Sequence, residues 1–230
     1  TCPITHVHMG ITAENVAERH GISRAAQDEF AAQSYAKAVA AQKQGKFKDE
    51  IFALEIPQHK GPALTFDLDE DVRDTPLESL AKLRPAFKKD GTVTAGNASN
   101  INDGAAALVV ASAAYVKTSG KKPLARIFGF ASAGLEPSHM GLGPARAIPK
   151  LMQKLGWSYP SVDLWELNEA FAAQSIGVLR ELPEIDPTRV NVHGGAIALG
   201  HPVGASGARI LATLVYALRD RGERRGVASL

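Results

Sequence analysis

The stretch Asn191-Val-His-Gly-Gly-Ala-Ile-Ala-Leu-Gly-His-Pro-Val-Gly-Ala-Ser-Gly-Ala208 says most about how this chain folds. Six of its eighteen residues are glycine or serine, so the backbone can bend sharply and approach a ligand closely. His201 comes immediately before Pro202, which favours an extended backbone at the histidine. An apolar helical pattern then runs from about Gly204 to Arg221. Such a loop in front of a helix N-terminus could receive an anionic or oxyanionic group, but a tight turn with a surface histidine would give the same pattern.

The rest of the second half alternates short apolar runs with helical patterns. Strands are expected over residues 105–111, 125–133, 162–167, 190–192 and 226–230. Helices are expected over residues 113–118, 145–155 and 204–221, with another opening at Asn168-Glu-Ala-Phe171. This alternation predicts an α/β layered domain. Ligands of such sheets bind beyond the carboxyl ends of the strands, and Asn168 and His201 both follow an expected strand.

The beginning of the chain is predicted to be helical. Thr12 is the expected N-cap of a helix over residues 11–20. Ser23 is the expected N-cap of a longer helix that ends near Gln44, with Gly45 as its stop.

The middle of the chain is less regular. Residues 51–56 are expected to form a strand, and Thr75-Pro-Leu-Glu78 has the pattern of a capping box that opens a short helix. The run 91–104 is polar, turn-prone and without periodicity, which is typical of loops that carry function. Ser99, within that run, has no neighbouring histidine or lysine to activate it, so we expect it to form hydrogen bonds rather than act as a nucleophile.

Composition excludes several classes of protein. The chain of 230 residues is 45% hydrophobic and 22% charged with a net charge of +2, which is ordinary for a globular protein and gives no reason to expect nucleic-acid binding. No apolar run approaches the roughly 20 residues of a membrane span, and no signal peptide is recognisable. The single cysteine, Cys2, cannot form an internal disulfide. We therefore expect a cytoplasmic protein, with the mitochondrial or peroxisomal matrix as alternatives.

Metal binding is not expected. His6 and His8 lie two residues apart, as two ligands on a strand might, but no cluster of cysteines or carboxylates accompanies them. The acidic run 67–73 lacks the glycine and the final glutamate of an EF-hand loop, so a solvated surface explains it better.

Six motifs in the chain resemble those of the thiolase family, and within it the biosynthetic branch of acetyl-CoA acetyltransferases. They are His8-Met-Gly-Ile-Thr-Ala-Glu-Asn-Val-Ala17, Lys82-Leu-Arg-Pro-Ala-Phe87, residues 91–104, Met140-Gly-Leu-Gly-Pro144, Asn168-Glu-Ala-Phe171 and residues 194–208. Each motif alone is weak evidence, but all six follow the family's order across essentially the whole chain.

The resemblance implies a layered α-β-α-β-α fold of the thiolase type. Residues 1–118 would then belong to the family's N-terminal domain, including the loop domain that binds CoA, and residues 119–230 to its C-terminal domain without the last strands. The implied activity is the reversible condensation of two acetyl-CoA to acetoacetyl-CoA and CoA, through an acyl-cysteine, in fatty acid and lipid metabolism. No cofactor is implied beyond these CoA thioesters, and the complete protein would be a homodimer or homotetramer.

The resemblance also implies roles for individual residues. His201 would activate the nucleophilic cysteine, and Asn168 would hold a water that completes an oxyanion hole. Residues implied to contact CoA or the acyl group are His8, Arg73, Ser79, Leu83, Phe87, Ala95, Ser99, Met140, Ala170 and Phe171. Without the resemblance, Leu83 and Phe87 would be taken as ordinary core residues.

Two departures from the family pattern matter. Asn100 stands where the family usually has glycine, although asparagine tolerates a positive φ and could keep the loop shape. The nucleophilic cysteine and the second catalytic cysteine have no counterpart here, and Cys2 lacks the motif of either. The alternative is therefore a non-catalytic CoA-binding or interaction fragment of a thiolase. In either case we expect the isolated 230 residues to expose a large apolar face and to be poorly soluble or associate. A 3-ketoacyl-ACP synthase fits less well, because Asn168-Glu-Ala-Phe171 is foreign to that group.

Overall fold

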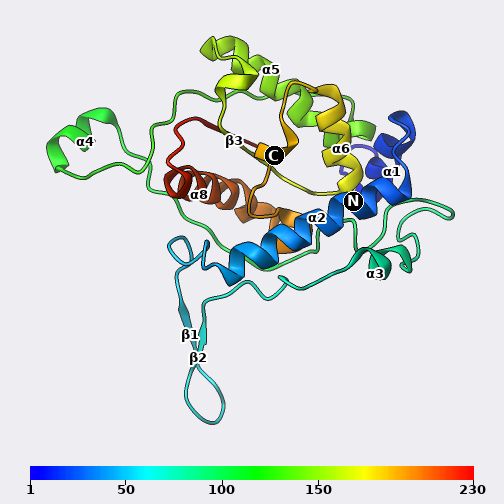
Figure 1. Ribbon diagram of the computed structural model, residues 1–230, viewed down its shortest axis with the longest axis horizontal. Coiled ribbons are helices and arrows are strands. Elements are labelled where there is room, and N and C mark those ends of the chain that lie inside the picture. The colour runs from blue at the N-terminus through cyan, green and yellow to red at the C-terminus, as the bar shows by residue number, and fades with distance from the viewer.

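The computed structural model describes all residues from 1 to 230 (Figure 1). It opens with two helices, α1 (Met9–Arg19) and α2 (Arg24–Lys43). Ser23 caps α2 by accepting a hydrogen bond from the Ala26 amide at 3.2 Å, as predicted. The prediction that Thr12 caps α1 was wrong. His8 is the N-cap, with Nδ1 accepting from the Gly10 amide, and the Thr12 hydroxyl lies one turn inside the helix, bonded to the Met9 carbonyl.

A hairpin projects from the body after α2 (Figure 1). Its strands, β1 (Leu54–Ile56) and β2 (Leu64–Phe66), pair antiparallel. The next helix, α3 (Leu77–Ala81), begins after Pro76 and has no side-chain cap. The capping-box prediction was wrong because the Thr75 hydroxyl turns back to the Arg73 carbonyl.

The second half contains one parallel strand pair, β3 (Leu164–Leu167) and β4 (Gly226–Ser229). Helix α8 (Val203–Arg221) connects back to β4 and packs on both strands. Both strands lie within segments predicted as strands, and α8 begins one residue before the predicted helix over residues 204–221. The expected strand at 190–192 is reduced to single bridges, one of them between Val190 and Trp165.

Three further helices and three 3-10 turns complete the body. They are η1 (Pro137–Leu142), α5 (Gly143–Leu155), η2 (Tyr159–Ser161), α6 (Ala172–Glu181), η3 (Pro187–Arg189) and α7 (Ala196–Leu199). Helix α6 begins four residues later than the sequence suggests, so Asn168-Glu-Ala-Phe171 is a non-helical turn between β3 and α6. This turn places Asn168 next to His201, in the candidate site described below.

Residues 101–135 are the part of the chain where the secondary structure predicted from the sequence was wrong. Only α4 (Ala113–Ser119) is regular there, and the predicted strands at 105–111 and 125–133 do not form. Val109 is 98% exposed and Phe130 77% exposed, so these apolar residues have no covering layer. The reason is the absence of a partner strand, because an isolated strand leaves its backbone unpaired.

The main core lies between α1, α5, α6 and β3, and includes Val16, Ile148, Trp165 and Val178. A second cluster joins α2, α3 and α7 through Tyr35, Leu80 and Ile197. No helix is long and apolar enough to cross a membrane.

Candidate active site

Asn168 and His201 meet, although they are 33 residues apart in the chain. Asn168 follows the last residue of β3, and His201 follows α7 in the glycine-rich loop. The Asn168 Nδ2 atom lies 3.3 Å from His201 Nε2. Asn168 is buried, and its Oδ1 atom makes no hydrogen bond within the protein. A histidine nitrogen and an amide oxygen are thereby presented side by side.

The other ring nitrogen of His201 is held by Ser206, in the first turns of α8. The Nδ1 atom lies 2.6 Å from the Ser206 hydroxyl oxygen, and that hydroxyl donates its own hydrogen to the Pro202 carbonyl. Ser206 has one hydrogen to give, so the bond to Nδ1 requires the ring to donate. In this arrangement Nδ1 carries the hydrogen, and the lone pair on Nε2 faces the Asn168 Nδ2 group.

The surroundings of His201 favour the neutral form of its imidazole. Burial lowers the pKa of the imidazole, and the positive charge of Arg209, on α8, lowers it further. A neutral ring with a lone pair on Nε2 is a competent general base near neutral pH.

The backbone on either side of His201 is also fixed. Gly200 has a φ of +88°, and a side chain there would overlap the Asn102 carboxamide. The His201 amide donates to both the Asn100 carbonyl and Asn102 Oδ1, each at 3.2 Å. Asn102 is in turn hydrogen-bonded to Asp71. Asn100 therefore helps to hold His201 in place through its backbone carbonyl, and not through its side chain.

Aromatic rings form a second wall next to this pair. His8 stacks on Phe87 with ring centroids 4.7 Å apart, and Phe87 meets Phe171 edge to face at 6.2 Å. The Ser99 amide and hydroxyl both donate to the Ala170 carbonyl at 3.0 Å. Five residues predicted to contact CoA thus lie in one continuous wall, joined to Asn168 through the turn before α6.

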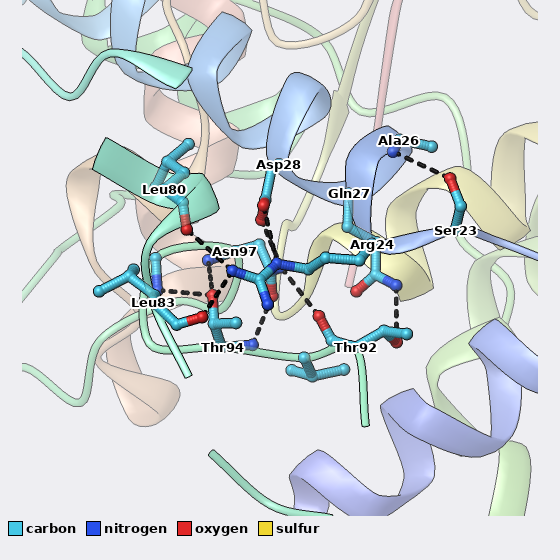
Figure 2. A network of polar contacts seen from close by, with 12 residues as sticks. Ser23, Arg24, Ala26, Gln27, Asp28, Leu80, Leu83, Thr92, Thr94 and Asn97 are labelled. Atoms are coloured by element: carbon cyan, nitrogen blue, oxygen red, sulfur yellow. Dashed lines mark hydrogen bonds and ion pairs between the residues drawn. The ribbon is translucent and has the colours of Figure 1, made fainter. Parts of the chain in front are cut away.

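The loop that contributes Ser99 is fastened to α2 and α3 by the polar network shown in Figure 2. Asp28 accepts from the Asn97 side chain at 2.8 Å and from the Arg24 guanidinium at 2.7 Å. Arg24 also donates to the carbonyls of Leu80 and Leu83, both at 2.8 Å. This network gives the loop a rigid base.

The remaining predicted residues lie farther along the same half of the chain. Leu83 packs over Gly96, next to the exposed Ala95. Arg73 and Ser79 are exposed, and Met140 is half exposed in η1. No hydrogen bond joins these side chains to Asn168 or His201, so their predicted roles in binding CoA stay predictions.

Cys2 is not part of this arrangement. Its hydrogen bonds all lie within its own turn, where Sγ accepts from the Thr5 amide at 3.4 Å. Hydrogen bonding to Thr5 lowers the pKa of the thiol, but the residue is buried and has no histidine partner. The structure also has no group of three metal-binding side chains.

Sequence reasoning missed two residues of the site, Ser206 and Glu169. Glu169 is 2% exposed and accepts hydrogen bonds from Ser34 and Asn191. Burial raises the pKa of Glu169, and those two hydrogen bonds partly offset the rise. The only available signal was a carboxylate in an otherwise apolar stretch between a strand and a helix.

Two family models match the chain. The thiolase N-terminal domain matches residues 1–114, and the thiolase C-terminal domain matches residues 121–230. Among curated proteins, the acetyl-CoA acetyltransferases of Pseudomonas aeruginosa and Chromobacterium violaceum are each 56% identical over 224 residues. The match covers 97% of this chain and 57% of each relative, so the chain spans little more than half of their length.

Solved structures agree with these matches. The Bacillus anthracis acetyl-CoA acetyltransferase superposes with a TM-score of 0.96 at 48% identity, over 99% of this chain and 58% of that one. A human mitochondrial 3-ketoacyl-CoA thiolase in complex with CoA gives 0.87 at 46% identity, over 96% of this chain and 54% of that one. The α/β fold that the sequence motifs imply is confirmed.

Proposed function

The chain belongs to the thiolase family, and from that premise we propose that its parent protein is an acetyl-CoA acetyltransferase. It would condense two acetyl-CoA molecules to acetoacetyl-CoA and CoA, and catalyse the reverse thiolysis. The observation that carries the proposal is the pairing of His201 Nε2 with Asn168 Nδ2 at 3.3 Å.

His201 would act as the general base of the first half-reaction. A cysteine supplied from outside these residues approaches Nε2, which removes the thiol proton. The thiolate attacks the acetyl carbon of acetyl-CoA, and the carbon–sulfur bond to CoA breaks. The proton on Nε2 passes to the departing CoA thiolate, so the half-reaction leaves an acetyl-cysteine and free CoA.

Oxyanion stabilisation would come from the same pair. Once protonated, His201 Nε2 is a donor to the oxygen that becomes negative during acyl transfer. Asn168 Oδ1 has no partner within the protein and can accept from a water whose second hydrogen points at that oxygen. In condensation, this arrangement would stabilise the enolate oxygen of the second acetyl-CoA.

The aromatic wall of His8, Phe87 and Phe171 would line the path of the pantetheine arm. A CoA complex of one similar thiolase supports a CoA site in this fold. Toward the nucleotide end, Arg73 and Ser79 are exposed and would contact phosphate and ribose. Leu83, Ala95 and Met140 would complete the apolar sides.

The remaining expectations about the whole protein are proposals of the same kind. CoA thioesters would be its only small-molecule partners, with no further cofactor. We propose a homodimer or homotetramer, measurable by sedimentation, and a cytoplasmic location.

The test is acetoacetyl-CoA thiolysis by the full-length protein, followed in the presence of CoA by the loss of the absorbance of the acetoacetyl enolate. His201→Ala and Asn168→Ala should each lower kcat by at least about 100-fold, as loss of a general base or an oxyanion donor does. His59→Ala, on the exposed end of the hairpin, is the matched control and should leave the rate unchanged. Wild-type rates in both site variants would refute the proposal. Turnover by the 230-residue chain alone would instead make Cys2 the nucleophile.

A further inference from the structure

Glu169 is a buried carboxylate directly beside one member of the catalytic pair in the sequence. It directly follows Asn168 and is 2% exposed. A buried carboxylate is costly unless hydrogen bonds compensate for its lost hydration. The contacts of Glu169 therefore indicate what the carboxylate is there to hold.

Those contacts come from three separate parts of the chain. The Ser34 hydroxyl, on α2, donates to Oε2 at 2.6 Å. Asn191 Nδ2, at the start of the glycine-rich loop, donates to Oε1 at 2.8 Å. The Ile197 amide, in α7, also donates to Oε2 at 3.4 Å.

The glycine-rich loop is shaped around this carboxylate. A side chain at Gly195 would overlap the carboxylate of Glu169, and the Gly195 amide donates to Ser34 Oγ at 3.0 Å. Gly194, at a φ of +80°, packs directly on α2, where a side chain would collide with Ser34 and Ala38. Both glycines are thus needed because the loop is drawn against Glu169 and α2.

Asn191 ties the same loop to the end of β3. Its Oδ1 accepts from the Leu167 amide at 2.8 Å, and its Nδ2 donates to the Leu167 carbonyl at 2.8 Å as well as to Glu169. Asn191 adopts a φ of +45° to do so. Glu169 therefore lies between two segments that these hydrogen bonds hold together. One is the end of β3, which leads to Asn168, and the other is the glycine-rich loop, which leads to His201.

We propose that Glu169 is a positioning residue that fixes the distance between His201 and Asn168 by holding the glycine-rich loop against the end of β3. The effect of Glu169 on catalysis rests on the proposed function, whereas the contacts that hold the loop against β3 do not depend on it. No part of Glu169 needs to touch substrate.

The carboxamide of glutamine cannot replace this carboxylate, although it has the same shape. All three partners are donors, and glutamine offers one acceptor oxygen and one NH2 group. If its oxygen faces Asn191, the Ile197 amide loses its partner. If its oxygen faces Ser34 and Ile197, its NH2 group confronts the Asn191 NH2, and Asn191 cannot turn over without losing both bonds to Leu167.

The test compares Glu169→Gln with wild type in the full-length protein. We expect kcat of thiolysis to fall by about 10- to 100-fold, since displacing a catalytic group by about 1 Å has effects of that size. KM for CoA should stay unchanged, because none of the hydrogen bonds of the Glu169 carboxylate involves the rings of His8, Phe87 and Phe171. A loss confined to kcat removes an interaction made in the transition state rather than in binding.

Asp163→Asn is the matched control. Asp163 lies just before the other end of β3 and also anchors a loop, by accepting from the Arg224 and Arg225 amides at 3.0 and 2.8 Å. It should leave kcat and KM unchanged. An unchanged kcat in Glu169→Gln would overturn the proposal, and so would an equal loss in Asp163→Asn, which would indicate a general structural effect.

A second readout does not depend on turnover. The imidazole nitrogen signals of His201, followed by NMR in protein labelled at histidine, should shift in Glu169→Gln and stay in place in Asp163→Asn. An unmoved His201 signal would overturn the proposed positioning role even if the protein were inactive.

Absence of thiolysis in the wild type would refute the proposed function alone. Ser34→Ala removes one of the three donors to Glu169 and the acceptor of the Gly195 amide, but leaves the carboxylate and its bond to Asn191 in place. It should move the same signal less and serves if Glu169→Gln does not fold.

Discussion

The segments 105–111 and 226–229 are both short apolar runs that predict strands, but only the second forms one. Strand β4 pairs with β3 at four positions, and Val227 within it is 3% exposed. No backbone hydrogen bond joins residues 105–111 to any other segment, and Val109 within them is 98% exposed.

The difference between the two segments lies outside them. Strand β4 has a neighbouring strand and α8 packed against it, and together they satisfy its backbone and cover its side chains. Composition and periodicity report what a segment can form, whereas pairing depends on a second segment. The three predictions below test how far stability is concentrated around β3 and β4.

The largest effect is expected from Trp165→Ala in β3. Trp165 is 1% exposed in the main core and stacks on Tyr159 with ring centroids 5.9 Å apart. Removing a buried tryptophan should lower the free energy of unfolding by about 3–5 kcal/mol. Urea unfolding of the 230-residue chain followed by circular dichroism measures this. Trp157→Ala, at a half-buried position, is the comparison and should cost less; an equal or larger loss there would mean that β3 is not the centre of stability.

The candidate site was predictable from sequence where its residues mark local features. Asn168 ends a strand and His201 follows a glycine-rich turn, and both features are visible over a few residues. The contacts that hold them were not predictable, because Ser34 and Glu169 are 135 residues apart and no local pattern joins them. The same limit explains why the helix at 24–43 was predicted well from its cap and stop, while 105–111 was not.

An intermediate effect is expected from Glu166→Gln, also in β3, on the pH dependence of the free energy of unfolding. Burial raises the pKa of Glu166 to about 8, and the positive charge of Arg209, 3.8 Å away, offsets only part of the rise. The folded state therefore binds this proton more tightly than the unfolded state. Its contribution to stability is complete below about pH 4.5, the ordinary pKa of the group, and is lost as the pH rises through about 8.

Glu166→Gln should remove this dependence, so that the free energy of unfolding falls less between pH 5 and 8, by on the order of a few kcal/mol. Half-buried Glu50, whose pKa burial raises to about 7, would leave a smaller slope of the same sign. Glu184→Gln, at an exposed position, should keep the full slope. A variant Glu166→Gln with the wild-type slope would mean that Glu166 is ionised in the folded protein.

The smallest effect is expected from Val109→Ser in the 230-residue chain. Val109 has almost no contacts to lose, so the free energy of unfolding should change by no more than about 0.5 kcal/mol. The same substitution should reduce association of the chain, measured by sedimentation, because it removes part of the exposed apolar run. Made in the full-length protein, it becomes a direct test of the strand prediction. A loss of more than about 1 kcal/mol there would mean that 105–111 gains a partner strand and a covering layer, since only a buried valine is costly to replace by serine. An unchanged stability there would mean that the apolar pattern of this segment does not reflect a buried strand, and that the contrast with β4 is intrinsic to the fold.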